Sequence, residues 1–223
     1  IATGFHAIEF LLWGQDLNET PATAGRRSHT DYLLGTGCTN GSCARRGTYL
    51  RLAANLLVFD LRNMVDDWRP GREGYWNLFA TLPAAERLRR IVEGLGTMSA
   101  GELAGERLQV ALVAHSQEDE QSCFSDTTHL DTLYNATGIR ALYLGKYLRS
   151  DGTMIAGPSL SRWVAERAPE LDARIRDQLA ATQSAAEDVS TTAMQGEPFD
   201  RIVRAEYPAG PARVEGLIGF LTQ

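Results

Sequence analysis

Apolar residues recur at intervals of three and four along most of the chain, and this spacing restricts the fold more than any other feature. Within residues 47–66, apolar residues recur at helical spacing at Leu50, Ala54, Leu57, Leu61 and Val65. This period places one apolar stripe on a helix. No segment alternates convincingly with the two-residue period of a strand, and no repeat of fixed length occurs. The sequence therefore predicts an all-α protein whose helices pack as bundles.

The same reasoning gives the expected order of elements. Helices are expected at residues 1–13, 47–66, 83–96, 99–112, 125–138, 158–194 with a break at Pro169, and from about residue 210. The helix at 99–112 is expected to begin with a capping box, Ser99 with Glu102. Residues 15–46 form an irregular stretch longer than an ordinary loop. Residues 138–153 could be strand-like or a helix followed by a turn, and they are expected to be mostly loop.

Two helical lobes are expected, residues 1–150 and 151–223. The stretch "SDGTMIAGP", residues 150–158, collects turn-forming residues and marks the boundary between them. The net charge of -6 argues against a nucleic-acid-binding surface. No apolar run reaches the length that a bilayer-spanning helix needs, so a membrane-spanning protein is not expected.

Two of the three cysteines suggest a disulfide. Cys38 and Cys43 bracket "TNGS", in which Asn40-Gly41 is a strong signal for a tight turn. Such a turn brings two sulfur atoms within bonding reach, and a disulfide there would indicate an oxidising compartment such as the bacterial periplasm. Two free thiols are the alternative, and Cys123 is expected to be a buried free thiol.

The first helix carries the sharpest functional hypothesis. In "TGFHAIEFLLW", the stripe of Thr3, His6, Glu9 and Trp13 lies on one helix face, and the other faces are apolar. A helix that is apolar on its other faces is expected to be buried, and a buried carboxylate needs a cation, a set of hydrogen-bond donors or a proton. Gly4 would let another backbone or a ligand approach closely. The alternative is that His6 and Glu9 bond only to each other or to arginines in an internal network.

A second polar cluster follows at residues 115–129. Its possible metal ligands are His115, Glu118, Asp119, Glu120, Asp126 and His129. A continuous helix would place His115, Glu118, Ser122, Asp126 and His129 on one face. Alternatively, Ser125 or Asp126 caps a new helix, and residues 118–120 form a solvated acidic face.

Several segments resemble one known family. "GFHAIEFLLWG" is similar to the G-x-H-x-x-E signature of the imelysin-like proteins, which include insulin-cleaving metallopeptidases and iron-regulated proteins of bacterial envelopes. "GTGCTNGSCARRGTYL", "GELAGERLQVAL", "EDEQSCFSDTTH" and "GPSLSRWV" resemble further segments of that family, in its usual order. The resemblance implies an all-helical protein of two bundle-like lobes, exported to the periplasm or the outer-membrane surface.

The resemblance also implies a site. The signature maps to Gly4, His6 and Glu9, near the junction of the lobes. We expect residues 122–129 to form the second wall of this site, with Asp126 and His129 as further metal ligands and with Ser122 and Ser125 as ligand-binding residues. The expected cofactor is a divalent metal, iron or zinc.

Three functions are compatible with this site. The favoured hypothesis is a non-enzymatic protein of iron acquisition that binds a metal ion or an iron complex. The second is a zinc metallopeptidase acting on peptides, with His6, Glu9 and His129 as ligands and Glu118 or Glu120 as the base. The third is a structural module in which the polar stripe is an internal network.

The resemblance raises one further expectation, about a partner. Family members are longer and carry a signal segment and helices upstream of the signature, so we expect residues 1–223 to be part of a longer precursor. We therefore expect the missing N-terminal part of the same precursor, or another copy of the chain, to cover the apolar face of residues 1–12.

Overall fold

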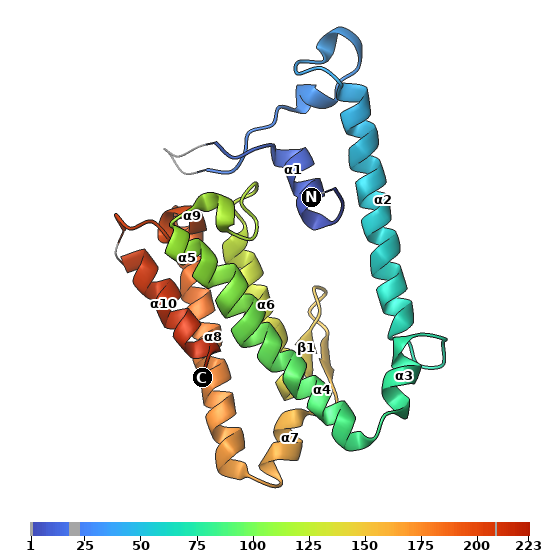
Figure 1. Ribbon diagram of the computed structural model, residues 1–223, viewed down its shortest axis with the longest axis vertical. Coiled ribbons are helices and arrows are strands. Elements are labelled where there is room, and N and C mark those ends of the chain that lie inside the picture. The colour runs from blue at the N-terminus through green and yellow to red at the C-terminus, as the bar shows by residue number, and fades with distance from the viewer. Residues whose placement is uncertain (1, 18–22, 208) are drawn as a thin grey trace. The chain divides into compact units, whose positions relative to one another are not determined.

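The computed structural model describes residues 2–17, 23–207 and 209–223, and it divides into two compact units, residues 1–92 and 93–223. Helices make up nearly all of the regular structure in these residues (Figure 1), which confirms the all-α prediction. None of the helices in the described ranges is long and apolar enough to cross a bilayer.

The first unit is built on one long helix. Its elements are α1 (Phe5–Trp13), the short 3₁₀ turns η1 (His29–Tyr32) and η2 (Gly35–Gly37), α2 (Cys43–Asp67), α3 (Tyr75–Thr81) and the start of α4 (Ala84–Gly96). Both α1 and η1 pack against α2. The hydroxyl of Tyr32 donates a hydrogen bond to the carbonyl of Leu11, which fastens η1 to α1. Residues 23–42, expected to be irregular, therefore pack over α1 and the start of α2.

The predicted disulfide between Cys38 and Cys43 is present, with 5.9 Å between the two Cα atoms. The intervening turn contains Gly41, whose φ of 65° lies in the left-handed region that glycine adopts without a steric penalty. The disulfide ties this turn to the first residue of α2. It thereby holds Thr39 and Asn40 against η1, where both side chains form hydrogen bonds to Asp31.

Removal of this disulfide is expected to destabilise the first unit. In the chain-entropy account, closing so short a loop stabilises the folded state by about 2 kcal/mol. We expect the Cys38→Ser, Cys43→Ser double variant to lose about that free energy of unfolding in urea. Reduced wild-type protein should behave like the variant. An unchanged unfolding midpoint in both would contradict the prediction.

The second unit is a helical bundle. Its elements are the end of α4, the π-helical η3 (Thr97–Gln109), α5 (Val110–Ala114), η4 (Gln117–Asp119), α6 (Thr128–Leu144), β1 (Lys146–Leu148), β2 (Met154–Ala156), α7 (Leu160–Ala165), α8 (Pro169–Met194), α9 (Phe199–Ile202) and α10 (Ala209–Leu221). Helix α8 packs against α6 and α10, and α10 packs against η3 (Figure 1). Pro169 begins α8, so the predicted break there is confirmed.

The core of this bundle lies between η3, α5, α6, α8, α9 and α10. Its buried members are Leu103, Ala104, Leu108, Ala111, Leu112, Ala136, Ile139, Ala186, Val189, Ala193, Phe199, Ile202, Val203, Val214, Leu217 and Leu221. Small residues on α8 let its neighbours approach closely, while Phe199 and the leucines fill the space between the helices.

A buried carboxylate joins three of the bundle's helices. Asp172 on α8 accepts hydrogen bonds from Tyr143 on α6 at 2.9 Å and from Ser161 on α7 at 2.7 Å. The hydrogen bond from Ser161 lowers the pKa of Asp172, against the effect of burial, and the bond from Tyr143 and the charge of Arg176 act in the same direction. Burial, together with the bond to Asp172, raises the pKa of Tyr143 to about 12. Asp172 is therefore ionised in the folded protein and fixes α7 on the bundle.

Two expectations about the elements were wrong, the helix start at Ser99 and the mostly irregular structure of residues 138–153. Ser99 and Glu102 do not start a helix, because the backbone of Gly96 is helical and α4 runs on into η3 and α5. Residues 139–144 belong to α6. Residues 146–156 form an antiparallel hairpin in which Tyr147 pairs with Ile155. Residues 150–158, the predicted lobe boundary, lie within the second unit, and the division into lobes of residues 1–150 and 151–223 stays a prediction.

Candidate functional site

His6 and Glu9 form a hydrogen-bonded pair on α1. The distance from Nδ1 of His6 to a carboxylate oxygen of Glu9 is 2.8 Å. The side chain of Glu9 is buried, with a relative exposure of 10%, while that of His6 has an exposure of 36%. The carboxylate therefore lies inside the unit, and part of the imidazole faces outward.

Helix α1 buries only some of its apolar side chains. Its buried residues are Ala7, Glu9 and Leu11, whereas Phe5 is 65% exposed and Leu12 is 44% exposed within the described chain. Within the described chain these two apolar side chains are therefore not covered, and their burial by a partner stays a prediction. The helix packs against α2, and Glu9 is among its buried residues.

The hydrogen bond between His6 and Glu9 sets what the imidazole can do. When the carboxylate accepts a hydrogen bond from Nδ1–H of the neutral imidazole, the ring lone pair is on Nε2. Metal-binding histidines commonly donate their second N–H to a carboxylate in this way. The geometry is thus suited to one nitrogen ligand, His6, whose orientation is fixed by Glu9.

Gly4 lies directly before α1 and has a φ of 88°. This left-handed conformation explains the choice of glycine. No described protein atom lies within 4 Å of the position that a Cβ would occupy, so no neighbouring backbone uses the close approach that the sequence suggested. The role of Gly4 in ligand binding stays a prediction.

The second polar segment is not one continuous helix, so that hypothesis was wrong. His115 ends α5 in the left-handed conformation, and its Nδ1 lies 2.6 Å from the carbonyl oxygen of Val203. Helix α6 begins only at Thr128, after Asp126 with a φ of 55°. A new helix therefore begins here, as the alternative hypothesis requires, but its N-cap is Thr127 and not Ser125 or Asp126.

The two candidate serines of this segment have partners within it. The backbone N–H of Ser122 donates to the hydroxyl of Thr128 at 2.9 Å, and the hydroxyl of Ser122 donates to Asp131. The hydroxyls of Ser125 and Thr127 lie 2.8 Å apart. These bonds hold the turn against the first turn of α6. A ligand that used Ser122 or Ser125 would have to share or replace them.

The candidate acidic residues and His129 differ in their surroundings. Glu118 is exposed, Glu120 is buried, and Asp126 is half-buried. Burial lowers the pKa of the His129 imidazole, and the backbone of Asp126 and the charge of Asp131 offset this effect only in part. His129 is therefore neutral near pH 7, which is the form that binds metals.

The candidate ligands belong to two compact units. His6 and Glu9 lie in the first, and Asp126 and His129 lie in the second. Among the residues that the structure describes, no three His, Cys, Asp or Glu side chains form a group that could hold a metal ion. The convergence of these residues on one metal therefore stays a prediction.

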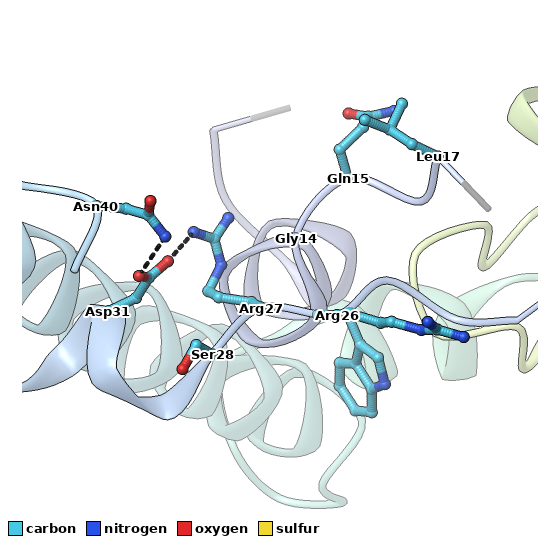
Figure 2. A pocket seen from close by; sticks show the side chains of 9 residues that line it. Gly14, Gln15, Leu17, Arg26, Arg27, Ser28, Asp31 and Asn40 are labelled. Atoms are coloured by element: carbon cyan, nitrogen blue, oxygen red, sulfur yellow. Dashed lines mark hydrogen bonds and ion pairs between the residues drawn. The ribbon is translucent and has the colours of Figure 1, made fainter.

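The structure also shows a pocket that the sequence did not indicate (Figure 2). It has a volume of about 330 Å³ and lies entirely in the first unit. Its lining residues are Trp13, Gly14, Gln15, Leu17, Arg26, Arg27, Ser28, Asp31 and Asn40. The pocket thus begins at the C-terminal end of the helix that carries His6 and Glu9.

A buried carboxylate, Asp31, holds one wall of this pocket. It accepts hydrogen bonds from Thr39 at 2.9 Å, Asn40 at 2.6 Å and Arg27 at 3.2 Å, and Arg46 lies 3.8 Å away (Figure 2 shows the bonds from Asn40 and Arg27). Burial alone would raise the pKa of Asp31. The three hydrogen bonds and the charge of Arg46 outweigh burial and lower that pKa, so Asp31 is an anion in the folded protein.

Two comparisons with known proteins complete this description. The family model described as Imelysin matches residues 1–223. No curated protein matches the sequence.

Proposed function

Because this chain belongs to the imelysin family, we propose that it is a protein of the bacterial envelope, periplasmic or at the outer-membrane surface, that binds a metal ion or an iron complex in iron acquisition. The site is centred on His6, with Glu9 as the residue that orients it. The carrying observation is the pair itself: a buried carboxylate 2.8 Å from an imidazole whose side chain is 36% exposed.

The donor set favours a metal that arrives with ligands of its own. A catalytic zinc site uses three protein ligands and an open position for water. In the first unit, the pair offers one imidazole nitrogen and one carboxylate, and Glu9 is already bonded to His6. An iron complex brings donor atoms with it and needs fewer from the protein. Asp126 and His129 are the proposed further ligands, and the neutral imidazole of His129 suits that role.

The disulfide supports the proposed location. Disulfides form and persist in oxidising compartments such as the periplasm and are rare in the cytosol. The bond between Cys38 and Cys43 lies in the unit that carries the His6 and Glu9 pair.

A bound metal would supply a positive centre for oxygen-rich ligands. His6 would provide one nitrogen ligand, and Glu9 would hold the imidazole in the required tautomer.

Binding measurements with the whole chain test this proposal. Calorimetric titration with ferric citrate and with zinc should show saturable binding of at least one of them. We expect His6→Ala to abolish this binding and Glu9→Gln to weaken it about 10–100-fold, as is typical for a residue that orients a metal ligand. His29→Ala removes an exposed histidine of the same unit and is the matched control, which should bind like the wild type.

Three results would separate the candidates. Equal binding by wild type and His6→Ala would refute the proposed site. Zinc-dependent cleavage of a protein substrate that is lost in both His6→Ala and Glu9→Gln would instead support a metallopeptidase. Absence of both binding and cleavage would leave the pair as an internal network, the third function compatible with the sequence.

A further inference from the structure

The pocket at the end of α1 has a fixed frame. The backbone N–H of Arg27 donates to the carbonyl of Trp13 at 2.7 Å. Gly25 lies so close that a Cβ there would be 2.7 Å from the Trp13 carbonyl oxygen and 2.8 Å from that of Gly14. No side chain fits at residue 25, so residues 25–27 lie directly against the end of the helix. The cavity is held by backbone contacts as well as by side chains.

Arg27 is held in place on three sides. It donates to Asp31 at 3.2 Å and to the carbonyl of Phe10 at 3.4 Å, and its guanidinium lies 5.4 Å from the centre of the Phe10 ring. Arg46 also faces Asp31, so the charge of Asp31 is shared between two arginines. The cluster of Asp31, Arg27 and Arg46 therefore carries one net positive charge.

Arg26 is the second arginine of the pocket lining. Its side chain is exposed and donates one hydrogen bond, at 3.0 Å, to the hydroxyl of Thr23. It forms no ion pair with any described residue. Two arginines and one aspartate line the described part of the cavity, which gives a net charge of +1 in a chain whose net charge is -6. This local excess of positive charge favours the binding of an anionic ligand.

Trp13 and Leu17 are the large apolar residues of the lining. Trp13 is 37% exposed and is one of the lining residues. A guanidinium matches the two oxygens of a carboxylate in one plane, and aromatic rings stack favourably on an indole. The volume of about 330 Å³ lies at the lower end of the range for small-molecule sites.

We propose that this pocket binds a small aromatic carboxylate, with Arg26 contacting the carboxylate and Trp13 contacting the ring. Arg27 adds positive potential from a fixed position but keeps its hydrogen bond to Asp31. The pocket is separate from the His6 and Glu9 pair, and its occupation requires no metal. The proposal therefore does not depend on the proposed function.

Titration of the whole chain with 4-fluorobenzoate, followed by ¹⁹F NMR, tests the proposal. The expected result is saturable binding of 4-fluorobenzoate and none of 4-fluorobenzamide, which has the same shape without the charge. Arg26→Gln should weaken binding about tenfold, as expected for one charge-assisted hydrogen bond. Trp13→Leu should weaken it as well.

Arg51→Gln is the matched control. Arg51 is also exposed, lies in the same unit and donates to a threonine three residues earlier, at 3.3 Å, but it does not line the pocket. Its replacement should leave binding unchanged. The proposal would be overturned if Arg26→Gln and Arg51→Gln weakened binding equally, or if the benzamide bound as well as the benzoate. It would also be overturned if inorganic phosphate displaced the ligand at a lower concentration than benzoate does, or if no binding occurred up to about 10 mM.

Discussion

Replacement of Asp31 by alanine is expected to lower the melting temperature of the first unit by on the order of 10 °C. Asp31 is 2% exposed, and it is the shared partner of two arginines that are themselves mostly buried. Without the carboxylate, Arg27 and Arg46 keep their charges in a partly dry environment, and the hydrogen bonds from Thr39 and Asn40 are lost. Differential scanning calorimetry of the variant measures this effect.

A surface ion pair provides the control for Asp31. Asp66 lies 3.1 Å from Arg69 in the same unit, but both side chains are about half exposed. Exposed pairs contribute little to stability, so Asp66→Ala should shift the melting temperature by no more than about 2 °C. Similar shifts for the two variants would show that Asp31 does not hold the first unit together.

The lowered pKa of Asp31 also predicts how the stability of this unit depends on pH. A carboxyl whose pKa is lower in the folded state than its ordinary value of 3.8 stabilises the fold above that ordinary value. Its contribution is lost as the pH falls below 3.8 and through the lowered pKa. Acid unfolding of Asp31→Asn should therefore show a weaker dependence on pH in this range than acid unfolding of the wild type.

Replacement of Phe199 by alanine is expected to destabilise the second unit by about 3–5 kcal/mol. Phe199 begins α9, is fully buried and belongs to the core shared with α8 and α10. Its removal leaves a cavity that the surrounding helices cannot fill without moving. Urea unfolding followed by far-ultraviolet circular dichroism measures the loss.

Phe220 is the matched control for this effect. It lies on α10 and is 37% exposed, so Phe220→Ala removes the same group from a partly solvated position. The expected loss is below about 1.5 kcal/mol. If the two variants lost equal free energy, the core would not be centred on Phe199.

Long helices were predictable because their apolar spacing is local. Helices α2 and α8 extend over many turns, so the period is sampled often enough to be recognised. The disulfide was also predictable, since Asn40-Gly41 specifies a tight turn between two cysteines close in sequence. The hairpin at residues 146–156 was not, because three-residue strands are too short to show alternation.

A tertiary contact explains why the predicted helix start at Ser99 was wrong. Ser99 and Glu102 match a capping box, yet the hydroxyl of Ser99 donates to the carbonyl of Leu221 at 2.7 Å. A partner 122 residues away thus uses the group that the local pattern assigned to a helix start. Local spacing contains no information about such a contact.

The candidate site also has one part that the sequence predicted and one part that it did not. His6 and Glu9 are three residues apart, and a helix places such residues on neighbouring positions of one face. The pocket depends on Asp31 meeting residues 39, 40 and 46, and on residue 25 meeting the end of α1. Only the spacing of Arg27 and Asp31, four residues apart, could have indicated it.

The boundary between the two units falls between Val92 and Glu93, inside α4. A chain severed there would expose four carbonyl groups on one piece and four amide groups on the other, each without a helical partner. Recombinant expression of either half is better planned with the cut at the Leu82–Pro83 peptide bond, where the backbone of Leu82 is extended and α4 has not yet begun. Pro83 would then lead the second piece into its helix.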